Sequence, residues 1–269
     1  MQNRHALSAS QGFLLTLVFS STLFSAAVST PSAFDILCRT MLSHSVFDLE
    51  NFKRALQDAC EAGFDSSSPY LYSRVDDVSV VYHGVRHPTH AYVITKELLS
   101  LSEGHDIEKL LTTQYTSRKF TCLHEAAHHP TQAFELLTLF LEQFAGNIAV
   151  GQAAIMMRTF YGATVLHEAV EYETPNHELV VSLLLRQFAD NKAAMYDFMM
   201  MRNQWGQTAL DCAKTLKAAL EKKLMTGGGR SAYISERTDE PFSDWRSRHL
   251  TYLKSITAAI KVLEDAGAS

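Results

Sequence analysis

One segment of the sequence recurs along the chain at a nearly constant spacing, and this recurrence limits the possible folds more than any other feature. Thr121 begins TCLHEAAHHPTQAFELLTLFLEQFAGN, and Thr164, 43 positions later, begins TVLHEAVEYETPNHELVVSLLLRQFADN. A third copy, TALDCAKTLKAALEKKL, begins at Thr208. A weaker copy begins at Ser79, where HPT at 87–89 matches HPT at 129–131. Such regular recurrence predicts an array of stacked units in place of one compact core.

Each copy predicts a pair of helices. A short alanine-rich helix, 123–128 in the first strong copy, is followed by a break and by a longer amphipathic helix. The apolar residues of that longer helix recur at i, i+3, i+4 and i+7, namely Leu137, Phe140, Leu141 and Phe144. The low content of helix breakers, 6 prolines and 12 glycines in 269 residues, also favours an all-α chain.

Composition excludes several other classes. The 24 basic residues are outnumbered by 29 acidic ones, so the net charge gives no reason to expect a nucleic-acid partner. Four cysteines in a chain of 269 residues do not form a disulfide framework. No phosphate-binding glycine motif is present, and the polar, glycine-rich stretch 225–245 is predicted to be a flexible insertion. No cofactor and no bound metal are expected.

The N-terminal segment 1–35 has two interpretations. Its uncharged run from Phe13 to Val28, followed by small residues, is typical of a secretory signal peptide. It is too short for a confident membrane span, so no membrane span is expected. The same segment also reads as a degenerate first repeat, which we favour because of the repeats that follow. A signal peptide at 1–33 would make the protein secreted, whereas a degenerate repeat favours a cytoplasmic location.

The pattern T-x-L-H-x-A, followed by a second helix and a closing A-D-x-N, resembles the ankyrin repeat. The matching residues are Thr121, Leu123, His124, Ala126 and Ala127, and in the next copy Thr164, Leu166, His167 and Ala169. Gly162 and Gly206 stand where that family has its turn glycine, and 40–65 and 260–269 resemble further repeats. The resemblance implies an all-α, ankyrin-like solenoid of five to six irregular helix-turn-helix repeats over 36–269.

The repeats depart from that family in length. Their spacing of 42–44 residues exceeds the family's length of about 33, and the extra residues follow the longer helix, for instance at Ile148 to Phe160. Irregular arrays of this kind are similar to ankyrin-type effectors of intracellular bacterial pathogens, which act in the host cytosol.

The resemblance implies a noncatalytic, monomeric protein-interaction module, an adaptor or effector, that binds a protein partner in a concave groove. The groove residues implied are Lys119, Phe120, His128, His129, Phe160, Tyr161, Glu171, Tyr172, Gln204, Trp205 and Gln207. Exposed Tyr and Trp side chains are enriched at the centres of protein interfaces. The alternative for Phe160, Tyr161 and Trp205 is that they pack against the lengthened loops.

The sequence HEAAH at 124–128 offers a different function. On a helix, His124 and His128 would share one face and could bind zinc, with Glu125 activating a water, as in a secreted zinc-dependent metalloprotease. However, the same H-E-A recurs at 167–169, where no second histidine follows. The resemblance gives His124 and His167 a structural role, in which the ring hydrogen-bonds the backbone of the turn. We therefore expect no enzymatic activity.

Overall fold

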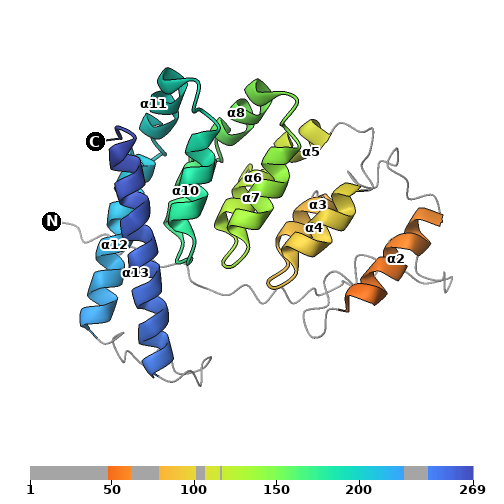
Figure 1. Ribbon diagram of the computed structural model, residues 1–269, viewed down its shortest axis with the longest axis horizontal. Helices are drawn as coiled ribbons and strands as arrows, with labels where there is room; N and C mark the ends of the chain where they lie inside the picture. The colour runs from red at the N-terminus through yellow and green to blue at the C-terminus, as the bar shows by residue number, and fades with distance from the viewer. Residues whose placement is uncertain (1–47, 62–78, 101–106, 116, 227–241, 269) are drawn as a thin grey trace.

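The structure, a computed structural model, describes residues 48–61, 79–100, 107–115, 117–226 and 242–268 (Figure 1). Within these residues the chain is almost entirely helix and turn, which confirms the prediction of an all-α fold. The helices are α2 (Leu49–Glu61), α3 (Val80–Val85), α4 (Ala91–Ser100), α5 (Ile107–Thr112), α6 (Cys122–His128), α7 (Ala133–Glu142), α8 (Ile148–Met156), α9 (Val165–Glu171), α10 (His177–Arg186), α11 (Lys192–Met200), α12 (Ala209–Met225) and α13 (Phe242–Asp265). No helix of the described part is long and apolar enough to span a membrane.

Some of the predicted segments lie outside the described residues. The N-terminal segment 1–35 is one of them, so neither of its interpretations is tested. The insertion predicted at 225–245 is described only at its two ends, and the repeat predicted at 40–65 only over 48–61, where α2 forms.

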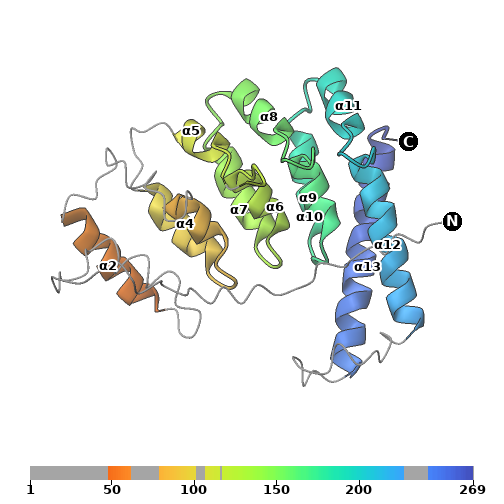
Figure 2. The same ribbon diagram turned by 180° about the vertical axis from the view of Figure 1, so that it is seen from behind.

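Pairs of helices are arranged side by side in one row that follows the order of the chain (Figures 1 and 2). Each short helix packs against the longer helix that follows it, giving the pairs α3–α4, α6–α7, α9–α10 and α12–α13. The short helices also pack against one another along the row, from α3 through α6 and α9 to α12, and so do the longer ones. Apolar faces are therefore buried between neighbouring units.

Between successive pairs the structure has a third helix that the sequence analysis did not predict. Helices α5, α8 and α11 follow the longer helices and lie along one edge of the row, at the top of Figure 1. Asn147 and Asn191 begin α8 and α11, where their side-chain oxygens accept hydrogen bonds from the amides of Val150 and Ala194. The extra residues of each long repeat thus fold as a short helix.

A threonine begins each short helix in the three strongest copies. The hydroxyls of Thr121 and Thr208 accept hydrogen bonds from the amides of His124 and Asp211, and these two side chains reach back to the threonine amides. Thr164 and His167 form the same reciprocal arrangement. This capping box satisfies amides at the helix start that have no partner within the helix, which explains why T-x-x-H recurs.

A small residue occupies the same place in the first helix of each pair. It is Gly84 in α3, and Ala126, Ala169 and Ala213 in the helices that follow, all buried. A Cβ atom on Gly84 would lie 3.0 Å from Cγ2 of Ile94 in α4. Only a small side chain lets the two helices of a pair approach this closely.

Candidate binding surface

Three tight turns lead into α6, α9 and α12. Tyr115 and Phe120 pair through two backbone hydrogen bonds, and two backbone hydrogen bonds also close each of the turns at 159–163 and 203–207. Each turn has one residue in the left-handed region, Gly162 (φ 73°), Gly206 (φ 75°) and, at the equivalent place, Lys119 (φ 56°). Glycine adopts this conformation without strain, whereas lysine does not.

Neighbouring turns are joined to each other by main-chain hydrogen bonds. The amide of Phe160 donates to the carbonyl of Arg118 over 2.7 Å, and the amide of Gln204 donates to the carbonyl of Tyr161 over 2.8 Å. The guanidinium of Arg158 donates to the carbonyls of Gly162 and Arg202, which ties two turns together from the side. The turns therefore form a continuous, braced edge.

This edge carries three exposed aromatic side chains, which we call the aromatic ridge: Phe160, Tyr161 and Trp205. Phe160 is 62% exposed and Trp205 is 61% exposed. The ring of Tyr161 lies edge-on to Phe160, with centroids 5.4 Å apart, and is stacked with Trp205 at 5.9 Å. The exposure of Phe160 and Trp205 argues against the alternative in which the lengthened loops bury these rings.

The other predicted groove residues differ in how exposed they are. Lys119, Glu171, Tyr172 and Gln204 are exposed, and His128 and Gln207 are half-buried. Phe120 and His129 are buried, so these two expected groove residues do not present their side chains to a partner. The ring of His129 caps the start of the longer helix, where Nδ1 accepts hydrogen bonds from the amides of residues 131 and 132, and Nε2 donates to the carbonyl of His87.

A cluster of polar side chains lies where α3, α6 and α9 meet. In it, Glu125 of α6 is fully paired: its Oε2 accepts a hydrogen bond from the hydroxyl of Tyr82 over 2.8 Å, and its Oε1 lies 3.1 Å from Nε of Arg86. Burial and the adjacent carboxylate raise the pKa of Tyr82, which keeps that hydroxyl protonated as a donor.

The equivalent carboxyl one unit further on, Glu168, has one oxygen without a hydrogen-bond partner among the described residues. Glu168 is only 4% exposed, and its Oε2 is buried without a hydrogen-bond partner among the described residues. Burial first, then the nearby carboxylates of Glu171 and Glu125, raise its pKa well above the usual value, and the positive charge of Arg118 opposes the shift. His128 stacks flat on Tyr172, with ring centroids 3.6 Å apart, and burial lowers its pKa.

Replacing Glu168 by glutamine should stabilise the protein at neutral pH. The raised pKa means that the carboxyl favours folding below its ordinary pKa of 4.5 and loses that contribution as the pH rises through the folded value. At pH 7 we expect E168Q to unfold with a free energy about 1–2 kcal/mol higher than that of the unsubstituted protein. This gain in stability should vanish near pH 4.

Urea denaturation at both pH values measures the gain, and Glu142→Gln, which changes an exposed carboxyl on α7, is the control. An equal stability of both proteins at pH 7 would contradict the expectation.

The HEAAH segment does not present its first histidine to a metal. Nε2 of His124 lies 3.1 Å from the carbonyl of Met157, to which it donates, and Nδ1 accepts from the amide and hydroxyl of Thr121. Both ring nitrogens are thus used, and burial lowers the pKa of His124 to about 4, which keeps the ring neutral. In the part of the chain that the structure describes, no three His, Cys, Asp or Glu side chains are grouped so that they could hold a metal ion.

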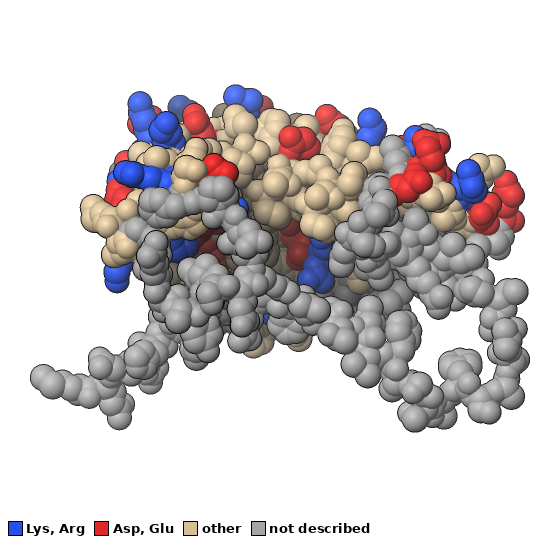
Figure 3. Space-filling model, turned by 90° about the horizontal axis from the view of Figure 1, so that it is seen from below, with Lys and Arg blue, Asp and Glu red and all other residues tan. Residues whose placement is uncertain are grey.

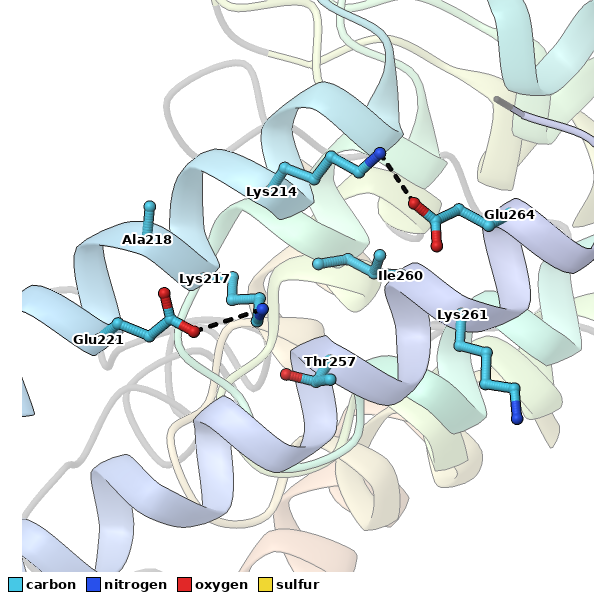
Figure 4. Close-up of a pocket in the computed structure, with 8 residues that line it drawn as sticks. All are labelled: Lys214, Lys217, Ala218, Glu221, Thr257, Ile260, Lys261 and Glu264. Atoms are coloured by element: carbon cyan, nitrogen blue, oxygen red, sulfur yellow. Dashed lines mark ion pairs between the residues drawn. The ribbon is translucent and has the colours of Figure 1, made fainter.

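In Figure 3 basic and acidic side chains are interspersed along the visible face, with broad uncharged areas between them. An open depression of about 420 Å³ lies between α12 and α13. Its walls carry the ion pairs Lys214–Glu264, at 2.8 Å, and Lys217–Glu221, at 3.3 Å (Figure 4). Because lysines and glutamates both line the depression, it has no single-sign field that would select a charged ligand.

No protein-family model matches the sequence, and no curated protein shows significant similarity to it.

Proposed function

We propose that this protein is a noncatalytic, ankyrin-like solenoid that binds a protein partner through the aromatic ridge and the adjoining groove, as an adaptor or effector. The observation that supports this most is the ridge itself, with two of its three rings more than 60% exposed on turns that are braced by main-chain hydrogen bonds. Exposing such rings to water is unfavourable unless a partner covers them. Rigid turns lose little conformational entropy on binding, so more of the contact energy becomes affinity.

The surface beside the ridge suits a protein better than a small molecule. The short helices present polar and aromatic side chains such as Glu171 and Tyr172, both exposed, alongside the turns. Aromatic anchors surrounded by polar groups are the usual composition of protein interfaces. Small-molecule sites are, in contrast, enclosed and mostly apolar.

Site-specific photo-crosslinking tests this proposal. A photoreactive amino acid at position 161 should crosslink a protein from cell lysate, and one at position 196, an exposed tyrosine on α11, should not. The captured protein is then purified and its affinity measured by calorimetry. The double variant Tyr161→Ala/Trp205→Ala should bind about 100-fold more weakly, because we expect each aromatic anchor to contribute about 1.4 kcal/mol, which is a factor of ten in affinity.

The controls are helix content and a remote surface change. Circular dichroism should be unchanged in the double variant, since both rings lie on turns and Trp205 is exposed. Tyr196→Ala should bind like the unsubstituted protein. If the double variant kept full affinity for the captured protein, the ridge would not be the binding surface.

A further inference from the structure

The two junctions between successive short helices can be compared residue by residue, because the sequence repeats. A shift of 42 positions places His128 where Arg86 stands and His124 where Tyr82 stands, and a shift of 43 places Glu168 where Glu125 stands. At the first junction, Arg86 and Tyr82 satisfy both carboxylate oxygens of Glu125. Glu125 therefore shows that a carboxyl at this position of the repeat can be satisfied by one cation and one hydroxyl.

At the second junction both partners are missing. The ring of His124 faces the other way and bonds to Thr121 and to the carbonyl of Met157. His128 is stacked on Tyr172, and its Nδ1 has no hydrogen-bond partner among the described residues. Glu168 is thus a buried carboxyl, 4% exposed, whose Oε2 has no hydrogen-bond partner among the described residues, although the positive charge of Arg118 acts on it. A buried acceptor without a partner is costly, so a ligand that supplies a donor gains the full benefit.

The side chains around Glu168 suit a guanidinium group. Glu171 lies three positions further along α9 and therefore shares its face, and it is exposed. The two carboxyls interact electrostatically. The ring of Tyr172 is 37% exposed, which leaves part of it open to a planar cation. Arginine forms paired hydrogen bonds with carboxylates and stacks on aromatic rings, and Arg86 already serves Glu125 in this way.

We propose that Glu168, Glu171 and Tyr172 receive an arginine side chain of the partner protein. This inference rests on the proposed function and specifies the chemistry of the partner: an arginine close to an apolar segment that covers the aromatic ridge. The incoming guanidinium forms an ion pair with Glu168, as Arg86 does with Glu125 within the chain. The site thus selects among proteins that could all cover an apolar ridge.

A peptide titration tests the arginine site without the natural partner. The probe is a ten-residue glycine-serine peptide with one central arginine, and its comparison peptide carries citrulline, which keeps the shape but not the charge. In two-dimensional NMR spectra of the full chain, the arginine peptide should shift the amide signals of Glu168, Glu171 and Tyr172. The citrulline peptide should bind at least tenfold more weakly.

Two variants of opposite design separate the site from general folding effects. Glu168→Gln should weaken the arginine peptide at least tenfold while it stabilises the fold, so a loss of binding cannot be attributed to unfolding. His128→Arg places the chain's own guanidinium at the position of Arg86 and should block the peptide to a similar degree. Glu142→Gln, an exposed carboxyl on α7, should leave the affinity unchanged.

The outcomes are distinct from those of the ridge experiment. Equal binding of the arginine peptide to Glu168→Gln and to the unsubstituted protein, or no shift of these amides at millimolar peptide, overturns the arginine site. In that case a captured partner that still depends on Tyr161 and Trp205 leaves the proposed function intact. If instead the arginine peptide binds as expected but no partner depends on the ridge, the proposed function fails and the arginine site stands alone.

Discussion

Replacing Phe188 by alanine should lower the free energy of unfolding by about 4 kcal/mol, in the range found for large buried aromatic residues. The side chain is fully buried, and its ring lies 5.1 Å from that of Phe198, centroid to centroid. Phe188 lies just beyond Gln187, the C-cap of α10, and Phe198 belongs to α11, so this contact fixes the third helix of the unit to the end of the longer one. Urea denaturation followed by circular dichroism measures the loss.

An exposed apolar residue on α10, the helix that precedes Phe188, provides the control. Leu179 lies on α10 and is 50% exposed, so Leu179→Ala should change the stability by less than about 0.5 kcal/mol. A loss below about 1 kcal/mol for Phe188→Ala would contradict this packing, because truncating a fully buried phenylalanine leaves a large cavity that lowers the stability by more than this. Units in a row stabilise mainly their neighbours, so the loss should be greatest in α10 to α13. Hydrogen exchange resolved by residue locates it.

The helix pairs were predictable because their signals are local and repeated. T-x-L-H at 121 and 164, and T-A-L-D at 208, correctly place the starts of α6, α9 and α12, since the threonine cap is itself the physical cause of the helix start. The third helices were not predictable from periodicity. In α8, IAVGQAAIM is apolar or small on nearly every side, so it has no polar face to mark its period.

The site was predictable only in part, because exposure depends on neighbouring units. The aromatic ridge follows from its position in the turns, and Phe160 and Trp205 are exposed as expected. The expectation for His129 was wrong: its ring turns inward to cap the longer helix. Glu168 was not predicted as a site residue because it belongs to the same repeated H-E-A motif as Glu125. Aligning the copies shows what distinguishes it from Glu125, because His128 and His124 stand where Arg86 and Tyr82 pair with Glu125.

Replacing His124 by alanine should cost about 3 kcal/mol of stability, because it leaves a cavity and removes bonds to two elements. The ring is fully buried and links Thr121, at the start of α6, to the carbonyl of Met157, which follows α8. His128→Ala in the same helix is the matched control. That change removes mainly the stacking on Tyr172 and should cost about 1 kcal/mol.

The comparison of these two variants decides between the two functions that the HEAAH segment suggests. A zinc site that used both histidines would lose metal and stability to a similar degree in either variant, whereas a structural His124 predicts unequal losses. The pH dependence gives a second criterion. Because the pKa of His124 is lowered from 6.5 to about 4, its contribution is present above pH 6.5 and is lost as the pH falls toward 4. The difference between His124→Ala and the unsubstituted protein should therefore shrink over that interval, with or without a chelator. Equal losses in the two variants, reversed by added zinc, would favour the metal site instead.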